Sequence, residues 1–333
     1  MTVTLKETIG VAVVGTGSIG MRHLRILGQL ETANPVAVPV HSQRIAQLKE
    51  EGFSAVADLD EAIQRGVTWA IIASDTGRHL EDSFAALERR LDLLVEKPLA
   101  VDAEQATRIV AQARQSKRRL FVGCVLRFSE SLNRFRELLG QIGPLHSVRI
   151  ECQSYLPDWR PNRPYRESYS ARMPEGGVLR DLIHELDYAG WLFGWPSAVQ
   201  GKARNLGRLG IQSEEVADLL WETPEGCVIS VHLDYLTRPT RRRMTAAGAL
   251  GTLEWDGVGQ TVTLSLSGTP PQEFRSLQTR DELFLAQAQA FLNTSQASSD
   301  PRLATGEDGV QALAVCDAVR IAKSGWQPVK ASR

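Results

Sequence analysis

The run Gly10–Gly20, with the sequence GVAVVGTGSIG, constrains the fold of this chain more than any other stretch. Its apolar residues predict a short buried strand, and three glycines at G-x-G-x-x-G spacing follow before helix-forming sequence begins. Such a turn needs glycine at three positions: Gly15 allows the tight turn, Gly17 allows the backbone to approach a pyrophosphate, and Gly20 allows the helix to pack closely on the strand. Helix N–H groups then face the phosphates, so the run predicts a dinucleotide site. The expected cofactor contacts are Gly15, Gly17, Ser18, Ile19 and Gly20.

Composition favours a globular protein that binds small molecules. The 333 residues, 43% hydrophobic and 23% charged, suffice for two domains rather than one. A net charge of -1 and a pI near 6.6 provide no field for holding a polyanion, which argues against a nucleic-acid partner. Widely spaced cysteines without a C-x-x-C pair indicate neither a disulfide framework nor a metal site. The N-terminus reads as a short strand and no apolar segment reaches membrane length, so we expect a cytoplasmic protein without a membrane partner.

The first part of the chain alternates short apolar runs with amphipathic stretches. Each strand must then cross over to reach the next, which implies parallel strands with helices on both faces of the sheet. We therefore expect an α/β protein whose residues 1–125 form a dinucleotide-binding Rossmann domain with a doubly wound parallel sheet. The expected strands are Val11–Val14, Val36–Val40, Trp69–Ala73, Leu91–Val95 and Leu120–Cys124.

From about residue 126 the sequence pattern changes to alternating apolar and polar residues, as in the run Cys227–Tyr235. Alternation is typical of strands with one wetter face, so residues 126–333 predict an α+β domain with a large, mostly antiparallel open sheet. This domain is expected to bind the substrate. An open sheet with apolar residues on its outer face is an association surface, so we also expect a homodimer or homotetramer through this sheet. Two amphipathic helices, Glu282–Leu292 and Glu307–Lys323, are expected near the end of the chain.

A charged pair, Glu96-Lys97, follows directly on a buried run that we count as the fifth strand of the first domain. Because the carboxyl ends of strands face the ligand crevice in an open α/β sheet, a lysine there can reach both substrate and cofactor. The alternative is an exposed lysine that begins a loop before Pro98.

Two glycines, Gly176 and Gly177, lead into a predicted helix that carries several polar groups on one face. At 3.6 residues per turn, His184 has Asp181 one turn before it and Asp187 one turn after it, with Tyr188 on the same face. A carboxylate can hold an imidazole in one tautomer, which is the arrangement that a general base needs. The alternative is a solvated helix face with polar pairs three residues apart.

In combination and order, these motifs resemble the Gfo/Idh/MocA oxidoreductases over nearly the whole chain. They are Gly15-x-Gly17-x-x-Gly20 with His23 after it, Glu96-Lys97-Pro98, Arg127-Phe128 after the expected sixth strand, and the Gly-Gly, Asp, His and Asp pattern of residues 176–187. The resemblance implies an NAD(P)-dependent dehydrogenase or reductase that acts on a CH–OH group of a sugar, cyclitol or nucleotide sugar. It assigns Lys97 and His184 to the carbon beside the nicotinamide. Glu96 and Lys97 are expected to contact the cofactor, and Arg127 and Asp187 the substrate. Asp187, which matches the family's later aspartate, is expected to be an orienting or structural group rather than a catalyst.

The chain departs from the family pattern at Asp181. The family commonly places its active-site aspartate four residues before the histidine, whereas Asp181 lies three before His184. One residue fewer rotates the pair by about 100° on a helix, although a helix that begins later would let Asp181 reach the site. An imidazole titrates near neutral pH and a lysine ammonium near about 10.4. We therefore expect His184 to act as the base and Lys97 to orient and polarise the substrate oxygen.

Cofactor choice depends on the end of the second strand, where an NAD site usually has an acidic residue. This chain has the sequence VPVHSQR at residues 38–44, without a carboxylate. Ser42 and Arg44 are suited to a 2'-phosphate, so NADP is favoured and NAD is the alternative. The loop Ser74–Thr76 and the following His79 are expected near the nicotinamide ribose, after what we count as the fourth strand, or else to cap a helix.

A proline-rich stretch, Tyr155–Arg166, combines aromatic rings with arginines. Flat rings cover sugar C–H faces and guanidinium groups hold carboxylate or phosphate, so this stretch predicts a substrate loop for an acidic or phosphorylated sugar. The alternative is an exposed connector. The expected contacts are Trp159, Arg160, Arg163 and Tyr165.

Three other functions share parts of this pattern. A dinucleotide- or sugar-sensing regulator on the same fold would bind without turnover, and a sugar hydrolase or lyase could oxidise its substrate transiently and return the hydride. A methyltransferase fits the glycines but leaves Glu96-Lys97-Pro98 unexplained.

Overall fold

The computed structural model describes residues 8–160, 164–295, 297–321 and 326–329, and the chain divides into two compact units. Unit 1 contains the described residues of Met1–Ala100 together with Glu104–Val125 and Thr279–Gly309. Unit 2 contains Val101–Ala103 and the described residues of Leu126–Gln278 and Val310–Arg333. None of the helices in the described part of the chain is both long and apolar enough to cross a membrane.

Unit 1 is built on a six-stranded sheet with the strand order β14-β5-β4-β3-β1-β2. The five strands from the first part of the chain are parallel, which confirms the expected doubly wound sheet. The order reverses beside β1, and such a reversal opens a ligand crevice at the carboxyl ends of the strands. The strands are β1 (Ile9–Val14), β2 (Ala33–Val38), β3 (Val67–Ile72), β4 (Asp92–Val95), β5 (Leu120–Val122) and the antiparallel β14 (Ala304–Thr305).

The count of strands before the charged pair was wrong. Leu91–Val95 is the fourth of the strands that we expected and corresponds to β4, and between β2 and β3 the chain forms only an isolated bridge from Ala37 to Ala55. Glu96-Lys97 therefore follows the fourth strand, Ser74 follows the third, and Arg127 comes after the fifth.

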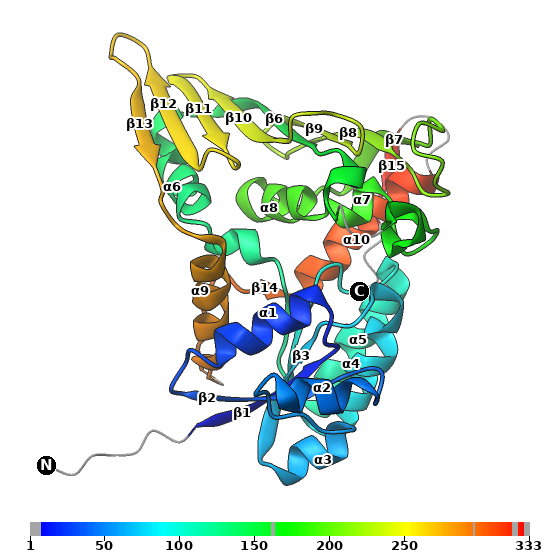
Figure 1. Ribbon diagram of the computed structural model, residues 1–333. Coiled ribbons are helices and arrows are strands. Elements are labelled where there is room, and N and C mark those ends of the chain that lie inside the picture. Colours follow the sequence, from blue (N-terminus) through cyan, green and yellow to red (C-terminus); the bar gives the residue numbers. More distant parts are fainter. Residues whose placement is uncertain (1–7, 161–163, 296, 322–325, 330–333) are drawn as a thin grey trace, which may run out of the picture. The chain divides into compact units, whose positions relative to one another are not determined.

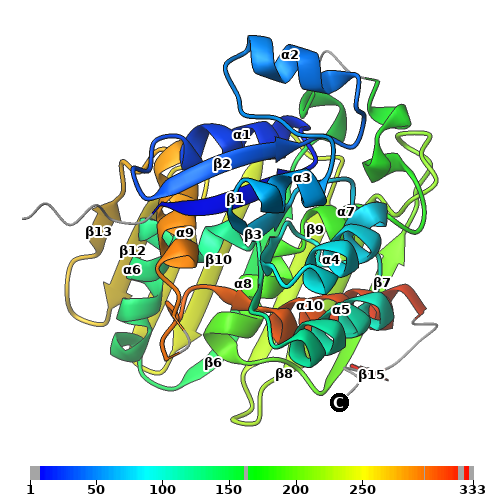
Figure 2. The same ribbon diagram turned by 90° about the horizontal axis from the view of Figure 1, so that it is seen from below.

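Helices cover both faces of the unit 1 sheet, and Figure 2 shows α1 beside α9. Helix α9 comes from the later part of the chain, which we expected to belong wholly to the second domain. It packs in unit 1 because the Phe291 ring meets Trp69 edge-on at 4.7 Å between ring centroids. The helices are α1 (Ser18–Leu27), α2 (Arg44–Glu50), α3 (Leu59–Gln64), α4 (His79–Glu88), α5 (Ala103–Ser116), α9 (Arg280–Leu292) and the start of α10 (Gly306–Ile321).

Unit 2 is built on a nine-stranded sheet with the order β13-β12-β11-β10-β6-β9-β8-β7-β15. Among the strands that the described residues form in this sheet, β6 and β9 alone pair in parallel, so the expected large, mostly antiparallel sheet is confirmed. In Figure 1 the helices α6, α7 and α8 lie on one face of this sheet. The strands are β6 (Leu145–Gln153), β7 (Ala198–Arg204), β8 (Val216–Glu222), β9 (Val228–Asp234), β10 (Arg241–Gly248), β11 (Gly251–Asp256), β12 (Thr261–Leu266), β13 (Gln272–Arg275) and β15 (Trp326–Pro328). The helices are α6 (Glu130–Leu138), α7 (Val178–Asp181), α8 (His184–Phe193) and most of α10.

The opposite face of this sheet is polar, whereas we expected apolar residues there. The strand register aligns one row of side chains that alternate in charge across six strands, which is a favourable arrangement of cross-strand pairs. Alternation along each strand sends the apolar residues to the helix-covered face instead. The row consists of Lys202, Asp218, His232, Glu151, Arg243 and Asp256.

His232 makes the stability of unit 2 depend on pH. Its Nδ1 lies 2.6 Å from Oδ1 of Asp218, and its Nε2 lies 3.2 Å from Oδ2 of Asp234. The hydrogen bond to Asp234, with the help of Asp218, raises the pKa of His232 from 6.5 to about 9. A raised folded-state pKa stabilises the fold fully below about pH 6.5, and this contribution is lost as the pH rises through about 9.

We expect the free energy of unfolding to fall by about 1 kcal/mol between pH 6 and pH 10 on account of this group, since solvent screens a partly exposed pair. Urea unfolding at both pH values measures the difference. His232→Gln should remove it, whereas His146→Gln, at an exposed position of β6, should not. Equal pH dependence in the wild type and His232→Gln would contradict this assignment.

Candidate active site

The glycine turn has the geometry that a bound pyrophosphate requires. Gly15 has φ of 89°, and a Cβ there would lie 2.5 Å from the Ser74 backbone nitrogen. A Cβ on Gly20 would lie 1.9 Å from the carbonyl oxygen of Gly15, so the helix can approach the strand only without a side chain. A Cβ on Gly17 would meet nothing within 4 Å. Two of the glycines are therefore needed for packing, and Gly17 borders open space.

The N-terminus of α1 is suited to an anion. Gly17 is its N-cap residue, and neither a capping side chain nor an acidic residue lies in the first turn. The N–H groups of this turn keep their partial positive charge, which favours a phosphate. The described residues thus fit a dinucleotide at this turn.

Arg44 lies close to the glycine turn. It begins α2, and its Nε donates to Oγ1 of Thr16 at 3.1 Å, while Nη1 donates to Gln47 at 3.3 Å. Ser42, two residues earlier, is exposed. The Arg44 guanidinium is thereby held beside the loop that carries Gly15 and Gly17.

The loop after β3 is fixed by two polar side chains. Ser74 Oγ donates to Asp82 at 2.6 Å. The ring of His79 is 1% exposed, and its nitrogens lie 2.9 Å from the Pro98 carbonyl oxygen and 3.0 Å from that of Ser74. Burial lowers the pKa of His79. His79 therefore joins the Ser74 loop to the residue after Lys97, and the neighbouring Thr76 is also buried.

The carboxylate of Glu96 is directed inward. It is 7% exposed, and its Oε1 lies 2.7 Å from Nε2 of the buried His23 on α1. Its Oε2 accepts the backbone N–H of Lys97 at 3.3 Å. Lys97 itself is half-buried at the carboxyl end of β4. Glu96 thus links α1 to the Lys97 backbone, and His23 is the partner that sequence reasoning named without giving it a role.

The prediction of one continuous helix after Gly177 is wrong, because the structure has two helices there, α7 and α8. Gly177 has φ of 96°, α7 ends at Asp181, and Leu182 leaves the helical region with φ of -96° and ψ of 30°. His184 then begins α8 and is half-buried. Asp181 therefore does not share a helix face with His184, and their three-residue spacing no longer fixes their relative rotation, whereas Asp187 and Tyr188 follow His184 on α8 as expected.

Asp181 is held by a tyrosine that sequence reasoning missed. Tyr235 donates its hydroxyl to Oδ2 of Asp181 at 2.5 Å, and both side chains are buried. Burial, and then the Asp181 charge, raise the pKa of Tyr235, while the Asp181 charge raises the pKa of Tyr169. The alternation that ends at Tyr235 did indicate an inward position for this ring.

Two buried ion pairs fix α8. Arg127 donates from Nε and Nη2 to both oxygens of Asp187, and each side chain is 2% exposed. Arg242 of β10 donates to Glu185 at 2.7 Å, and Glu185 is fully buried. Arg127 and Asp187, which we expected to contact the substrate, thus form a buried ion pair with each other.

The aromatic loop is partly ordered by its own contacts. Trp159 donates to Ser154 at 2.8 Å and meets the Tyr235 ring edge-on at 5.5 Å between centroids. Tyr165 donates its hydroxyl to the Leu209 carbonyl at 3.0 Å. Arg160 is exposed, and Arg163 lies outside the described residues.

The nearby arginines are engaged by carboxylates. Arg238 pairs with Asp158, Arg242 with Glu185 and Arg243 with Asp256. Across the described residues, no group of three or more His, Cys, Asp or Glu side chains is arranged to hold a metal ion.

The structure therefore gathers the expected site residues in two sets. In unit 1, the glycine turn, Arg44, the Ser74 loop and Lys97 follow the carboxyl ends of β1 to β4. In unit 2, Asp181 and His184 flank the break between α7 and α8, and Trp159 contacts the ring that binds Asp181.

Comparison with known proteins identifies the family. The model described as "Oxidoreductase family, NAD-binding Rossmann fold" matches residues 9–124, and the Gfo/Idh/MocA C-terminal domain model matches residues 135–254. The chain belongs to the Gfo/Idh/MocA oxidoreductase family. The resemblance drawn from the motifs is thus confirmed, and with it the fold class. The Gfo/Idh/MocA N-terminal model also confirms a nicotinamide dinucleotide as the cofactor class.

Individual Gfo/Idh/MocA-like proteins resemble the chain at modest identity. A 2,7-anhydro-N-acetylneuraminate hydratase of Mediterraneibacter gnavus is 29% identical over 65% of this chain and 58% of that protein. The myo-inositol dehydrogenase Hyg17 of Streptomyces leeuwenhoekii is 27% identical over 96% of this chain and 99% of that protein. Among solved structures, levoglucosan dehydrogenase in complex with NADH has a TM-score of 0.84 at 18% identity, over 97% of this chain and 100% of that chain. The last likeness shows the fold.

Proposed function

We propose that this chain transfers a hydride between a nicotinamide dinucleotide and a secondary alcohol or the matching ketone of a sugar, cyclitol or nucleotide-sugar-like substrate. The observation that carries the proposal is a glycine turn with open space at Gly17, followed by Lys97 at the carboxyl end of β4. The matched relatives, which act on inositol or an anhydro sugar by their names, support the substrate class.

The proposed roles follow from the chemistry of each group. The dinucleotide, when bound, supplies or accepts the hydride at its nicotinamide ring. His184 accepts the proton of the substrate hydroxyl, and Lys97 donates a hydrogen bond that polarises the oxygen. Asp181, oriented by Tyr235, is proposed to direct the substrate or the imidazole. Trp159, Arg160 and Tyr165 are proposed substrate contacts, and the Arg127–Asp187 pair is proposed to hold α8 in place.

The test is a panel of sugars, cyclitols and sugar acids with stoichiometric dinucleotide, read at the nicotinamide absorbance band and by mass spectrometry. Net reduction of the dinucleotide with conversion of the sugar supports the proposal. Product without net absorbance change supports transient oxidation, a candidate that the similarity to a hydratase favours. Binding without any product supports a regulator.

We further propose that NADP is preferred over NAD. Arg44, held at Thr16 beside the glycine turn, is placed to pair with a 2'-phosphate, and no carboxylate lies in residues 38–44 to accept ribose hydroxyls.

Arg44→Ala should weaken NADP binding by roughly tenfold or more, because a charge-assisted hydrogen bond contributes about 1.5–3 kcal/mol. NAD binding should change little. Calorimetric titration of both dinucleotides measures the two affinities, and Arg65→Ala, on the turn after α3, serves as a control. Equal losses for NADP and NAD would refute the preference.

We also propose that unit 1 binds the dinucleotide and unit 2 the substrate, and that the unit 2 sheet joins copies of the chain into a homodimer or homotetramer. The alternating charged row on its open face supports pairing by self-complementarity, since a two-fold axis between two strands sets opposite charges face to face. Sedimentation of the wild type at low and high salt tests this, because screening would weaken such an interface.

A further inference from the structure

A buried arginine in unit 2 joins two segments that flank the proposed catalytic groups in the chain. Arg180 of α7 donates from Nε to the Val101 carbonyl oxygen at 2.5 Å and from Nη2 to Oδ1 of Asp317 at 2.6 Å. The other oxygen of Asp317 accepts the backbone N–H of Ala103 at 2.8 Å. Arg180 and Asp317 therefore bind the segment Val101–Ala103 at its carbonyl end and its amide end.

The segment Val101–Ala103 and α7 each lie next to a proposed catalytic residue in the sequence. Val101 lies four residues after Lys97, and Arg180 lies four residues before His184. An extended chain spans at most about 3.6 Å per residue, so the Cα of Lys97 is within about 14 Å of the Cα of Val101. One guanidinium thus ties the backbone that follows the lysine to the helix that precedes the histidine.

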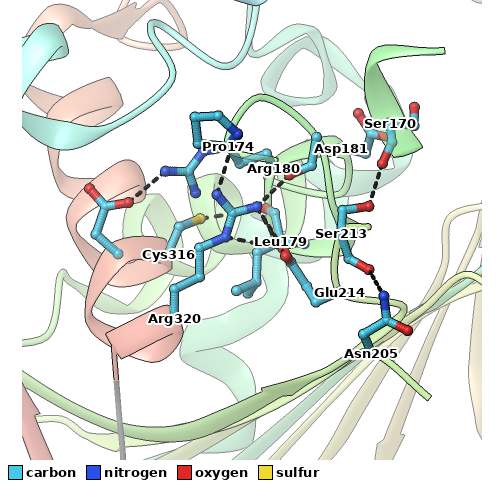
Figure 3. A network of polar contacts seen from close by, with 12 residues as sticks. Ser170, Pro174, Leu179, Arg180, Asp181, Asn205, Ser213, Glu214, Cys316 and Arg320 are labelled. Carbon is cyan, nitrogen blue, oxygen red and sulfur yellow. Dashed lines mark hydrogen bonds and ion pairs between the residues drawn. The ribbon is translucent and has the colours of Figure 1, made fainter. Parts of the chain in front are cut away.

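A second network of polar contacts holds the turn that begins α7 (Figure 3). Arg320 of α10 donates to Glu214, to the Pro174 carbonyl and to the Gly176 carbonyl. A Cβ on Gly177 would lie 2.3 Å from the Glu214 carboxylate, so Glu214 packs directly on the turn that begins α7. The start of α7 is held by Arg320 and Glu214, and Arg180 within it is held by Asp317.

We propose that Arg180 and Asp317 are positioning residues that hold the segment Val101–Ala103, which follows Lys97 in the chain, on α7, which precedes His184. The expected effect on catalysis rests on the proposed function. The hydrogen bonds of Arg180 and Asp317 to Val101 and Ala103 do not depend on it. Neither residue is assigned to touch the substrate. Arg180 is 2% exposed, and its hydrogen bonds go to a backbone carbonyl and a carboxylate.

The expected effect is large because orientation contributes strongly to rate. A misplacement of about 1 Å by a change remote from the chemistry can cost roughly 10²-fold in turnover. Lysine cannot replace Arg180, since one ammonium lacks the planar fork that reaches two acceptors in different directions. The dinucleotide site in unit 1 does not include either residue, so its affinity should be preserved.

The experiment compares Asp317→Ala with a matched control, Asp92→Ala. Asp92 in unit 1 also accepts one backbone N–H and one guanidinium, both from Arg119, and its side chain is 8% exposed. Both variants lose the same kinds of bond. Asp317→Asn serves where the alanine variant fails to fold, because its amide oxygen can still accept the Ala103 N–H while the ion pair to Arg180 is lost.

Two readouts are measured on the full chain. Hydrogen exchange of the free protein, in peptides covering residues 98–106, should be faster in Asp317→Ala than in the wild type, whereas Asp92→Ala should leave it unchanged. In the panel assay, kcat of Asp317→Ala and of Arg180→Lys should fall by roughly 10- to 100-fold. The dinucleotide Kd should change by less than about twofold, and Asp92→Ala should keep kcat within the same margin.

Unchanged exchange of residues 98–106 in Asp317→Ala would overturn the tie. Faster exchange with kcat equal to that of Asp92→Ala would overturn the positioning role. If the wild type converts no substrate of the panel, the proposed function fails, and the exchange measurement then decides the tie alone: protection lost on substitution supports it, and protection retained overturns it.

Discussion

Lys97→Ala is expected to lower kcat by roughly 10²–10³-fold, the usual cost of removing one donor that stabilises developing charge on a reacting oxygen. The dinucleotide Kd should stay nearly unchanged, because its phosphates are expected to bind the glycine turn and the α1 N-terminus, which lie elsewhere in the sequence. Steady-state kinetics with the best substrate of the panel, together with calorimetric titration of the dinucleotide, measure both quantities.

The control for this prediction is Lys49→Ala, which removes an exposed ammonium from α2. It should be indistinguishable from the wild type. A fully active Lys97→Ala enzyme would rule out the polarising role, and a large loss of dinucleotide affinity would show that Lys97 acts in binding instead.

His184→Gln is expected to lower kcat by roughly 10²–10⁴-fold, the range for a positioned general base. Glutamine keeps a polar side chain at the start of α8 but cannot accept a proton from the substrate hydroxyl. In the direction of alcohol oxidation, kcat/KM of the wild type should rise with pH as the base loses its proton, and the variant should lose this dependence.

The pH profile of kcat/KM, measured for the wild type and His184→Gln, tests the assignment. His232→Gln, a histidine on the open face of the unit 2 sheet, is the control and should retain the wild-type profile. If His184→Gln also retains it, the proton acceptor is another group, and Lys97 would be the next candidate.

The glycine turn is the part of the site that local sequence predicted well. Turn geometry depends on a few neighbouring residues, and the clashes that a Cβ would cause at Gly15 and Gly20 are the physical counterpart of that pattern. The parallel and antiparallel character of the two sheets was also predicted, because burial on one or both faces of a strand leaves a periodic trace in the sequence.

The helix after Gly177 shows where periodicity stops being informative. Its residues have helical spacing throughout, but Leu182 leaves the helical region between α7 and α8. The contacts that hold the two helices come from distant elements: Arg242 of β10 pairs with Glu185, and Asp317 of α10 pairs with Arg180. No local signal predicts such partners.

For the ionisable groups as well, the sequence indicated the position of a residue but not its partner. Residue type and position led us to predict Glu96 as a cofactor contact, Arg127 and Asp187 as substrate contacts and Asp181 as a residue of the active site, but they did not reveal the partners of these residues within the protein. Glu96 pairs with His23, Asp187 with Arg127, and Asp181 accepts from Tyr235. A buried charge binds whichever counter-charge or donor the fold brings to it, since leaving it unpaired is costly.

The amino-acid sequence by itself thus determined the glycine turn, the two kinds of sheet and the family. Each of these depends on the spacing of residues that are close together in the sequence. Tertiary folding alone selected the partners of the buried charges, the break before His184 and the packing of α9 in unit 1. Those outcomes depend on contacts between residues tens to hundreds of positions apart, as between Arg180 and Asp317, and desolvation makes such contacts obligatory only once the chain has collapsed around them.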